Sequence, residues 1–257
     1  MCIEAMATAL ETDKVCKSFG GVVALDEASI AVDTSSVTMI IGPNGSGKTT
    51  LINVISGYYK PDRGRVMFNG NDITSWPPHK IYRAGIVRTF QIPALFQKLT
   101  VLENLLVSAR SHPGENPVNA LFKIKWVKKE EELVDKAFKL LELLNLSHLW
   151  NQPVSKLSGG QMKLVELGRA LMSDPKVILL DEPIAGINPR LAHEIFEHIL
   201  NLRKELNTTF LVVEHRLDVA LRYVDKVYAM HRGRIIVEGG PNEVVSHPKV
   251  IESYLGG

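Results

Sequence analysis

Residues 37–49 read Val-Thr-Met-Ile-Ile-Gly-Pro-Asn-Gly-Ser-Gly-Lys-Thr, and this stretch decides the fold class of the chain. Its first five residues, apolar except for Thr38, are typical of a buried strand, and the glycines after them let the backbone wrap around phosphate groups. A helix is expected over 48–56, because Gly57 suits a helix C-terminus. The backbone N–H groups at the start of such a helix, together with the helix dipole, favour anions. The stretch therefore predicts a nucleotide phosphate site between a strand and a helix.

The individual residues of this loop have expected roles. Lys48 is expected to reach the β- and γ-phosphates of the nucleotide, and the hydroxyl of Thr49 is expected to hold Mg²⁺. We expect the loop and the residue that follows it to bind nucleotide through Gly42, Pro43, Asn44, Gly45, Ser46, Gly47, Lys48, Thr49 and Thr50. A glycine-rich turn without function is the competing interpretation, but here a strand precedes the loop and a helix follows it, as phosphate binding requires.

A second apolar run, residues 177–180, ends in two carboxylates, Asp181 and Glu182. Open α/β sheets bind their ligands at the carboxyl ends of the strands. Asp181 is therefore expected to bind Mg²⁺, directly or through water, and Glu182 to act as the general base that polarises the attacking water. Acidic residues at strand ends are common, so the pair is informative chiefly because a phosphate loop precedes it.

Between these two motifs lies the run Leu157-Ser158-Gly159-Gly160-Gln161. It offers a hydroxyl and bare backbone amides at the start of a helix expected to begin near Gln161. Such a helix start is a second anion site, with nothing left to bind in its own subunit. A tight turn without function is the less favoured explanation of the two glycines.

The rest of the chain favours an α/β fold. Alternating strands and helices indicate a mainly parallel sheet covered on both faces, while short β-prone pieces near the N-terminus and an edge-like strand over 65–69 indicate an antiparallel part. Apolar residues at helical spacing over 133–144 indicate a helical insertion. We expect one domain over 8–257, with a core formed by 8–92 plus 159–257, a helical subdomain over 93–158, and a flexible N-terminus over 1–7.

Composition excludes several classes of protein. Thirty Lys and Arg against 28 Asp and Glu give a formal charge of +2, which argues against a nucleic-acid partner. No apolar run approaches the roughly 18 to 20 residues that span a bilayer, and residues 1–12 hold no Lys or Arg, unlike a secretory signal. Cys2 and Cys16 are interpreted as free thiols in a reducing compartment. We expect a cytosolic chain that reaches any membrane through a partner.

In their order and spacing, the phosphate loop, the Leu-Ser-Gly-Gly-Gln run and the Asp181-Glu182 strand end resemble the nucleotide-binding subunits of ABC transporters, from about residue 14 to residue 255. The resemblance implies a P-loop ATPase that binds ATP and Mg²⁺ and works as a pair with the same or a homologous chain. In such pairs, Ser158, Gly159, Gly160 and Gln161 cover the γ-phosphate held by the partner subunit.

The resemblance also implies roles for three single residues. Gln91 matches the position that senses Mg²⁺ and the helical insertion, and His215 matches the residue that contacts the γ-phosphate and orients both water and Glu182. Phe19 matches the aromatic residue that stacks on adenine. From the residues alone, a surface Gln, a structural His and a core Phe are the competing interpretations.

Residues 85–91, 102–106, 182–189 and 248–256 look like those of the branch that imports branched-chain amino acids. This implies transport of Leu, Ile or Val through separate transmembrane permease subunits, with an external solute-binding protein, at the cytoplasmic face of the cell membrane. Asn188 departs from the Asp usual in ABC ATPases, as this branch often does. Urea or amide import, lipid-linked export, and a soluble ABC ATPase acting on DNA or ribosomes remain alternatives. A GTP-driven switch is less favoured, because the chain has no Asn-Lys-x-Asp segment.

A small basic cluster surrounds Trp126 and consists of Lys123, Lys125, Lys128 and Lys129. The simpler interpretation is a solvated helix start balanced by the acidic residues 130–132. Contact with lipid headgroups or with a membrane subunit is the alternative.

Overall fold

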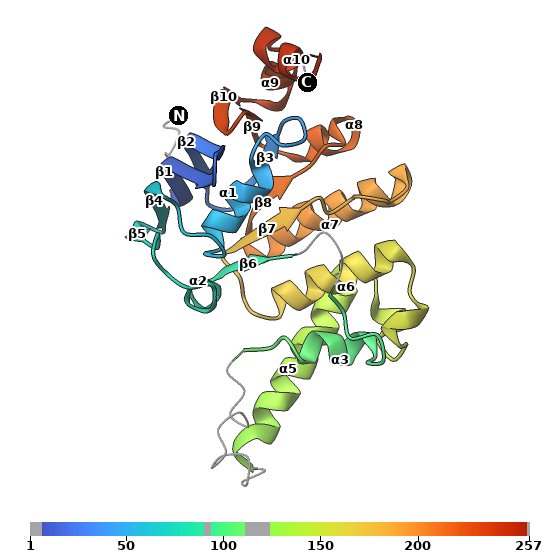
Figure 1. The fold of residues 1–257 in the computed structure, drawn as a ribbon. Coiled ribbons are helices and arrows are strands. Elements are labelled where there is room, and N and C mark those ends of the chain that lie inside the picture. The colour runs from blue at the N-terminus through green and yellow to red at the C-terminus, as the bar shows by residue number, and fades with distance from the viewer. Residues whose placement is uncertain (1–6, 90–93, 111–123, 256–257) are drawn as a thin grey trace, which may run out of the picture. The chain divides into compact units, whose positions relative to one another are not determined.

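The computed structural model describes residues 7–89, 94–110 and 124–255 of the chain (Figure 1). These residues form two compact units, one made of 7–89 with 176–255 and the other of 94–110 with 124–175. Gln91, Cys2 and Lys123 lie outside the described residues, as does the side chain of Lys125. Cys16 is a buried free thiol.

The first unit is built on a six-stranded sheet in the order β10-β9-β3-β8-β7-β6. Its strands are β3 Val37–Ile41, β6 Ile86–Arg88, β7 Val177–Asp181, β8 Thr209–Val213, β9 Lys226–His231 and β10 Arg234–Gly239. All neighbouring strands pair in parallel except β9 and β10. Every residue of β3, β7 and β8 is buried, which agrees with the largely apolar sequences typical of parallel strands covered on both faces. The expected mainly parallel sheet is confirmed.

A four-stranded sheet in the order β2-β1-β4-β5 forms the expected antiparallel part of the same unit. It contains β1 Thr8–Phe19, β2 Val22–Asp33, β4 Arg63–Phe68 and β5 Asn71–Asp72. The strand expected over 65–69 is present as β4, but its expected edge position is wrong, because the chain turns back after Phe68 and β5 pairs with the end of β4 through Met67 and Phe68. The two-residue β5 is too short to leave a periodic signal in the sequence.

Helices surround the sheets of the first unit (Figure 1). They are α1 Lys48–Ile55, α2 Pro78–Ala84, α7 Pro189–Leu206, α8 Leu217–Ala220, the single turn η4 Leu221–Tyr223, α9 Pro241–Val245 and α10 Pro248–Leu255. The apolar side chains of α1 share one buried cluster with residues of both sheets, so α1 fixes the end of β3 against the core. As expected, the helix stops before Gly57, which has a φ of +73°.

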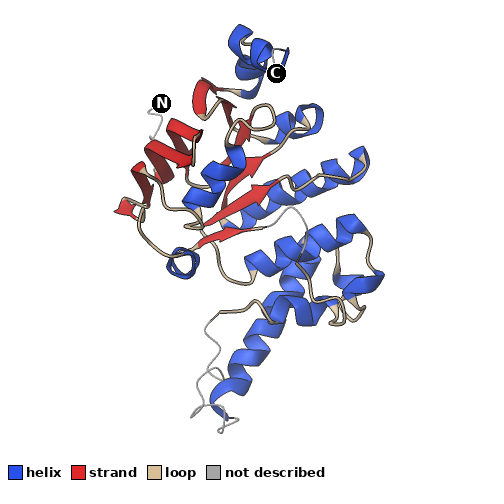
Figure 2. Ribbon diagram, viewed as in Figure 1, coloured by secondary structure: helices blue, strands red, loops and turns tan. Residues whose placement is uncertain are grey.

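The described residues of the second unit are helical apart from loops and one isolated bridge (Figure 2). They form α3 Val101–Leu106, α5 Ile124–Leu143, the short turns η2 Ser147–Leu149 and η3 Val154–Lys156, and α6 Gly159–Leu171. The apolar positions expected on one helical face are buried, namely Leu133, Ala137, Leu140, Leu141 and Leu144. None of the described helices in either unit is long and apolar enough to cross a membrane.

The helix α6 begins earlier than expected and belongs to the second unit. Ser158 is its N-cap, and Gln161 completes a capping box, so the helix starts at Gly159 rather than near Gln161. A Cβ added at Gly168 would lie 3.1 Å from Cδ1 of Leu144, which shows how closely α6 packs within this unit. The expected core, which includes residues from 159 onward, therefore differs from the observed division, in which residues up to 175 belong to the second unit.

Candidate functional site

The loop between β3 and α1 has a backbone that only glycine tolerates at two positions. A Cβ at Gly42, with φ +151°, would lie 2.1 Å from the Met230 carbonyl oxygen, and one at Gly47, with φ +107°, would lie 2.5 Å from the Ala24 carbonyl oxygen. The loop is therefore clamped between neighbouring backbones. Burial raises the pKa of the Tyr254 phenol in α10, while a hydrogen bond with the Gly42 backbone of this loop acts to lower it.

Lys48 folds its ammonium group into this loop. The Nζ atom donates to the carbonyl oxygens of Gly42 at 2.8 Å and Pro43 at 2.9 Å, and to Oγ of Ser46 at 3.3 Å. Burial lowers the pKa of Lys48 to about 8, against the opposing effect of the nearby carboxylates of Glu182 and Asp181. A partly desolvated cation thus lies at the carboxyl end of β3. The exposed Thr49 follows it in the first turn of α1, with Thr50 beside it.

Asp181 ends β7 and is buried, and its carboxylate accepts a hydrogen bond from Nη2 of Arg88 at 3.0 Å. The Nη1 atom of Arg88 donates to Oδ1 of Asn53 on α1. Burial raises the pKa of Asp181, while the Arg88 charge acts to lower it. Arg88 therefore orients the carboxylate and ties together β6, β7 and α1.

Glu182 and His215 form the second carboxylate contact, at the ends of β7 and β8. Oε1 of Glu182 lies 2.9 Å from Nε2 of His215, and both side chains are partly exposed to solvent. Glu182 has a φ of +51°, an uncommon conformation for a residue other than glycine. Its N–H donates to the Val213 carbonyl oxygen at 2.9 Å. The structure thus brings Lys48, the neighbouring Asp181 and Glu182, and His215 together from three distant segments of the sequence.

Three polar residues that contact this site were not among the predicted site residues, namely Asn53, Arg88 and Glu214. Each lies in a segment that the sequence assigned to a strand or helix of the core. A charged residue inside or at the end of an otherwise apolar run was the signal that could have identified Arg88 and Glu214. Glu214 is only 2% exposed, and burial raises the pKa of its carboxyl group, whereas hydrogen bonds from backbone N–H groups oppose this rise.

Phe19 ends β1 at the surface of the first unit. Its side chain is 42% exposed, so it is not a core residue. The ring meets the Tyr59 ring edge-on, with centroids 5.0 Å apart, and Nζ of Lys17 lies 5.5 Å from its centroid. Part of the ring is therefore accessible to solvent.

The Ser158–Gln161 segment opens α6 in the second unit. The N–H of Gln161 donates to Oγ of Ser158 at 3.3 Å, and the N–H of Ser158 donates to Oε1 of Gln161 at 2.9 Å. Gln161 is thus engaged in capping its own helix, while Ser158 and Gly159 are exposed. Asn188 has a comparable role in the first unit, as the N-cap of α7, where its Oδ1 accepts from the N–H of Leu191 at 3.0 Å.

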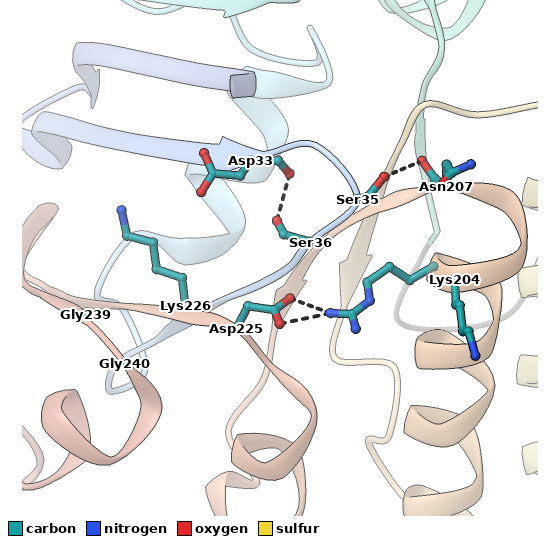
Figure 3. A pocket seen from close by; sticks show the side chains of 10 residues that line it. Asp33, Ser35, Ser36, Lys204, Asn207, Asp225, Lys226, Gly239 and Gly240 are labelled. Carbon is teal, nitrogen blue, oxygen red and sulfur yellow. Dashed lines mark hydrogen bonds and ion pairs between the residues drawn. The ribbon is translucent and has the colours of Figure 1, made fainter. Parts of the chain in front are cut away.

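A pocket of about 650 Å³ lies elsewhere in the first unit, beside residues that precede β3, β8 and β9 (Figure 3). Arg203 and Asp225, which line it, are paired at 2.7 Å, and the hydroxyls of Ser35 and Ser36 are bonded to neighbouring carbonyl groups. It is therefore at the amino ends of the strands, opposite the edge where parallel sheets bind ligands. None of the predicted site residues lines it.

The chain has a buried strand, a clamped glycine loop with a buried lysine, and two acidic residues at the carboxyl end of β7 in the same parallel sheet. These features define it as a P-loop nucleoside triphosphatase. Residues 25–185 match the family described as "ABC transporter", and residues 234–257 match the family described as "Branched-chain amino acid ATP-binding cassette transporter". The chain belongs to the ABC transporter family, as an ATP-hydrolysing cassette.

Individual proteins of this family are closely similar to the chain. It is 56% identical over 251 residues to a probable branched-chain amino acid transport ATP-binding protein of Methanocaldococcus jannaschii, covering 96% of this chain and 97% of the relative. A crystal structure of the ADP conformation of an ABC transporter cassette is 53% identical, with a TM-score of 0.85 over 98% of this chain and all of that one. A dimeric cassette in a post-hydrolysis state with ADP and Pi is 26% identical, with a TM-score of 0.73 over 90% and 98%.

Proposed function

We propose that this chain is the ATP-hydrolysing subunit of an importer for branched-chain amino acids, with Glu182 as the general base. The observation that carries the catalytic part is the 2.9 Å contact between Oε1 of Glu182 and Nε2 of His215. This pair shares one sheet edge with the Lys48 loop. The names of the C-terminal family match and of the 56% identical relative support the solute class.

The residues of the loop fit ATP. Lys48 supplies a buried positive charge, and the first turn of α1 supplies N–H groups for the β- and γ-phosphates. The exposed face of Phe19 is suited to stacking on adenine. The carbonyl groups that Lys48 now contacts are weaker partners for an ammonium group than phosphate oxygens, so the triphosphate should draw Lys48 toward it.

The residues also fit Mg²⁺. Among the described residues, no group of three or more His, Cys, Asp or Glu could hold a metal ion. Mg²⁺ is usually held by one or two protein oxygens together with waters and substrate phosphates, rather than by a complete protein cage. Thr49 and Asp181 would supply those oxygens, and Gln91, outside the described residues, is proposed as a further ligand. When bound, the ion would neutralise charge on the phosphates.

The described side chains supply the remaining chemistry. Glu182 would accept a proton from the water that attacks the γ-phosphate, and His215 would hold the Glu182 carboxylate and contact the γ-phosphate. Lys48 would offset negative charge on the β- and γ-phosphates as the bond to the leaving ADP breaks. Arg88 would keep Asp181 ionised in its buried position.

Hydrolysis would require two chains. Ser158, Gly159, Gly160 and Gln161 are proposed to close over the γ-phosphate held by a second cassette, the same or a homologous chain. The existence of a dimeric relative supports this arrangement, as does the preference of oligomers for two-fold symmetry. Transmembrane permease subunits at the cytoplasmic face of the membrane, supplied by an external solute-binding protein, complete the proposed importer.

Uptake of labelled leucine tests the proposal in cells that lack this chain and express either the wild type or Glu182→Gln at matched levels. Loss of a general base should slow ATP hydrolysis by about 10² to 10⁴-fold and leave ATP binding intact. Uptake restored by the wild type alone would support both the solute class and the role of Glu182. Leucine uptake unaffected by either form, with ATP hydrolysis intact, would reject the solute class and favour urea, another amide or a lipid-linked molecule.

A further inference from the structure

Glu214 lies between β8 and His215, and its buried carboxylate is bonded to three backbone N–H groups. Oε1 accepts from the N–H of Ile184 at 2.9 Å. Oε2 accepts from the N–H of His215 at 3.0 Å and of Arg216 at 3.4 Å. A buried carboxylate is costly unless such bonds replace its hydration. The negative charge of the neighbouring Glu182 repels that of Glu214 and acts to raise the pKa of Glu214. A second carboxylate at this buried position is therefore unfavourable without the hydrogen bonds it accepts.

The bond from Ile184 connects the two segments whose side chains form the proposed catalytic pair, and the bonds from His215 and Arg216 fix the segment that follows β8. Ile184 is buried in the turn that follows Glu182, and this turn is closed by a bond from the Ala185 N–H to the Glu182 carbonyl oxygen at 3.1 Å. Glu182 itself is held at a positive φ, which persists only where its surroundings enforce it. Glu214 thus fixes the backbone on both sides of the contact between Glu182 and His215.

Arg216 adds a second connection between the same segments. Its Nη1 atom donates to the Ile187 carbonyl oxygen at 2.8 Å, further along the turn that Glu214 holds. The segment after β8 is therefore hydrogen-bonded to the segment after β7 at two points, through Glu214 to Ile184 and through Arg216 to Ile187. Side chains that must meet within a few tenths of an ångström depend on such support, since a misplacement of about 1 Å can reduce a rate about 10²-fold.

We propose that Glu214 is a positioning residue for ATP hydrolysis, which holds Glu182 and His215 in register by linking their two backbones. This inference rests on the catalytic role proposed for Glu182. Glu214 contacts neither ATP nor water in this role; it acts through Ile184 and His215. A contribution to folding alone is the competing explanation, and the two differ in what happens to kcat.

The test is Glu214→Gln in the full-length chain, assayed for MgATP hydrolysis and for nucleotide binding. Gln keeps the shape but turns an NH₂ group toward backbone donors, so at least one bond is lost. We expect kcat to fall by about 10- to 100-fold, while the affinity for ATP stays within about threefold of the wild type. Thr12→Val is the matched control, because Thr12 is equally buried and also holds two backbone groups, in the antiparallel sheet. It should lower Tm and leave kcat unchanged.

A double variant separates positioning from stability. If Glu214 acts through Glu182, the Glu182→Gln/Glu214→Gln chain should be no slower than Glu182→Gln alone, within about twofold, because effects of residues that act as a unit are not additive. A further loss in the double variant equal to that in Glu214→Gln would overturn the proposal. Wild-type turnover by Glu182→Gln would instead reject the proposed general base, whatever Glu214→Gln shows.

Arg216→Met covers the case in which Glu214→Gln does not fold. It removes the bond to Ile187 without placing a donor in a buried site, and we expect a severalfold fall in kcat with ATP affinity retained. A wild-type kcat in folded Glu214→Gln would overturn the positioning role, and if only Arg216→Met folds, a wild-type kcat in that variant would count against the connection between the two segments.

Discussion

Replacing Lys48 by Met should change how the stability of the chain depends on pH. The pKa of Lys48 is lowered to about 8 in the folded chain, mainly by burial, and is 10.5 in a solvated lysine. The unfolded chain therefore holds the proton more tightly, and the folded chain is penalised wherever both states are charged. That penalty is complete below about pH 8 and disappears as the pH rises to 10.5. The free energy of unfolding should thus increase over this window through Lys48.

The magnitude follows from the size of the pKa difference. Each pKa unit corresponds to about 1.4 kcal/mol, which limits the penalty at pH 7 to about 3 kcal/mol, and partial contact with solvent reduces it further. About 2 kcal/mol of this is recovered by pH 9.5. Lys48→Met keeps the length of the side chain and removes the titrating group, so the difference between the two chains isolates Lys48.

Urea unfolding of both chains without nucleotide, at pH 7 and pH 9.5, measures this difference. Between the two pH values, the free energy of unfolding of the wild type should rise by up to about 2 kcal/mol more than that of Lys48→Met. The reasoning would be refuted if the difference in free energy of unfolding between the two chains stayed constant within about 0.5 kcal/mol. It would have the wrong sign if the variant became more stable relative to the wild type at the higher pH.

Two further variants test other contacts of the site. Arg88→Met should lower the free energy of unfolding by about 3 kcal/mol at pH 7, because it leaves the buried Asp181 carboxylate without its arginine partner. This loss should shrink at acid pH, where Asp181 takes up a proton. A loss that does not depend on pH would contradict the electrostatic cause. Asn188→Ala should cost about 1 kcal/mol through the lost cap of α7, while Asn188→Asp should stay within about 0.5 kcal/mol, as thermal unfolding can show. Equal losses in the two Asn188 variants would reject the capping role.

The elements that surround the phosphate loop were predictable from the sequence because their signals are local. An unbroken apolar run indicated β3, and glycine marked both the loop and the end of α1. The family resemblance was also correct, since three motifs in a fixed order are far more specific than any one of them. The start of α6 was missed, because the capping box satisfies N–H groups that allow the helix to begin two residues sooner.

Contacts between distant segments were not predictable from the same signals. Arg88 meets Asp181 across 93 positions of sequence, and the Ile184 N–H meets Glu214 across 30. These pairs depend on strand order, in which β3 lies between β8 and β9 and β7 joins β6 to β8. No period or composition in the chain encodes that order. The sequence therefore indicated candidate residues for the chemistry, whose roles stay predictions, but not the contacts that hold those residues in place.

The bond between Tyr254 and Gly42 has a practical consequence for work with this chain. An affinity tag, fluorescent protein or surface linker joined after residue 257 would begin only a few residues beyond a side chain that touches the phosphate loop. Any strain such a fusion places on α10 would reach the nucleotide site directly. Attachment ahead of β1 avoids this route, so kinetic constants for ATP are best compared between chains that carry their fusions at the N-terminus.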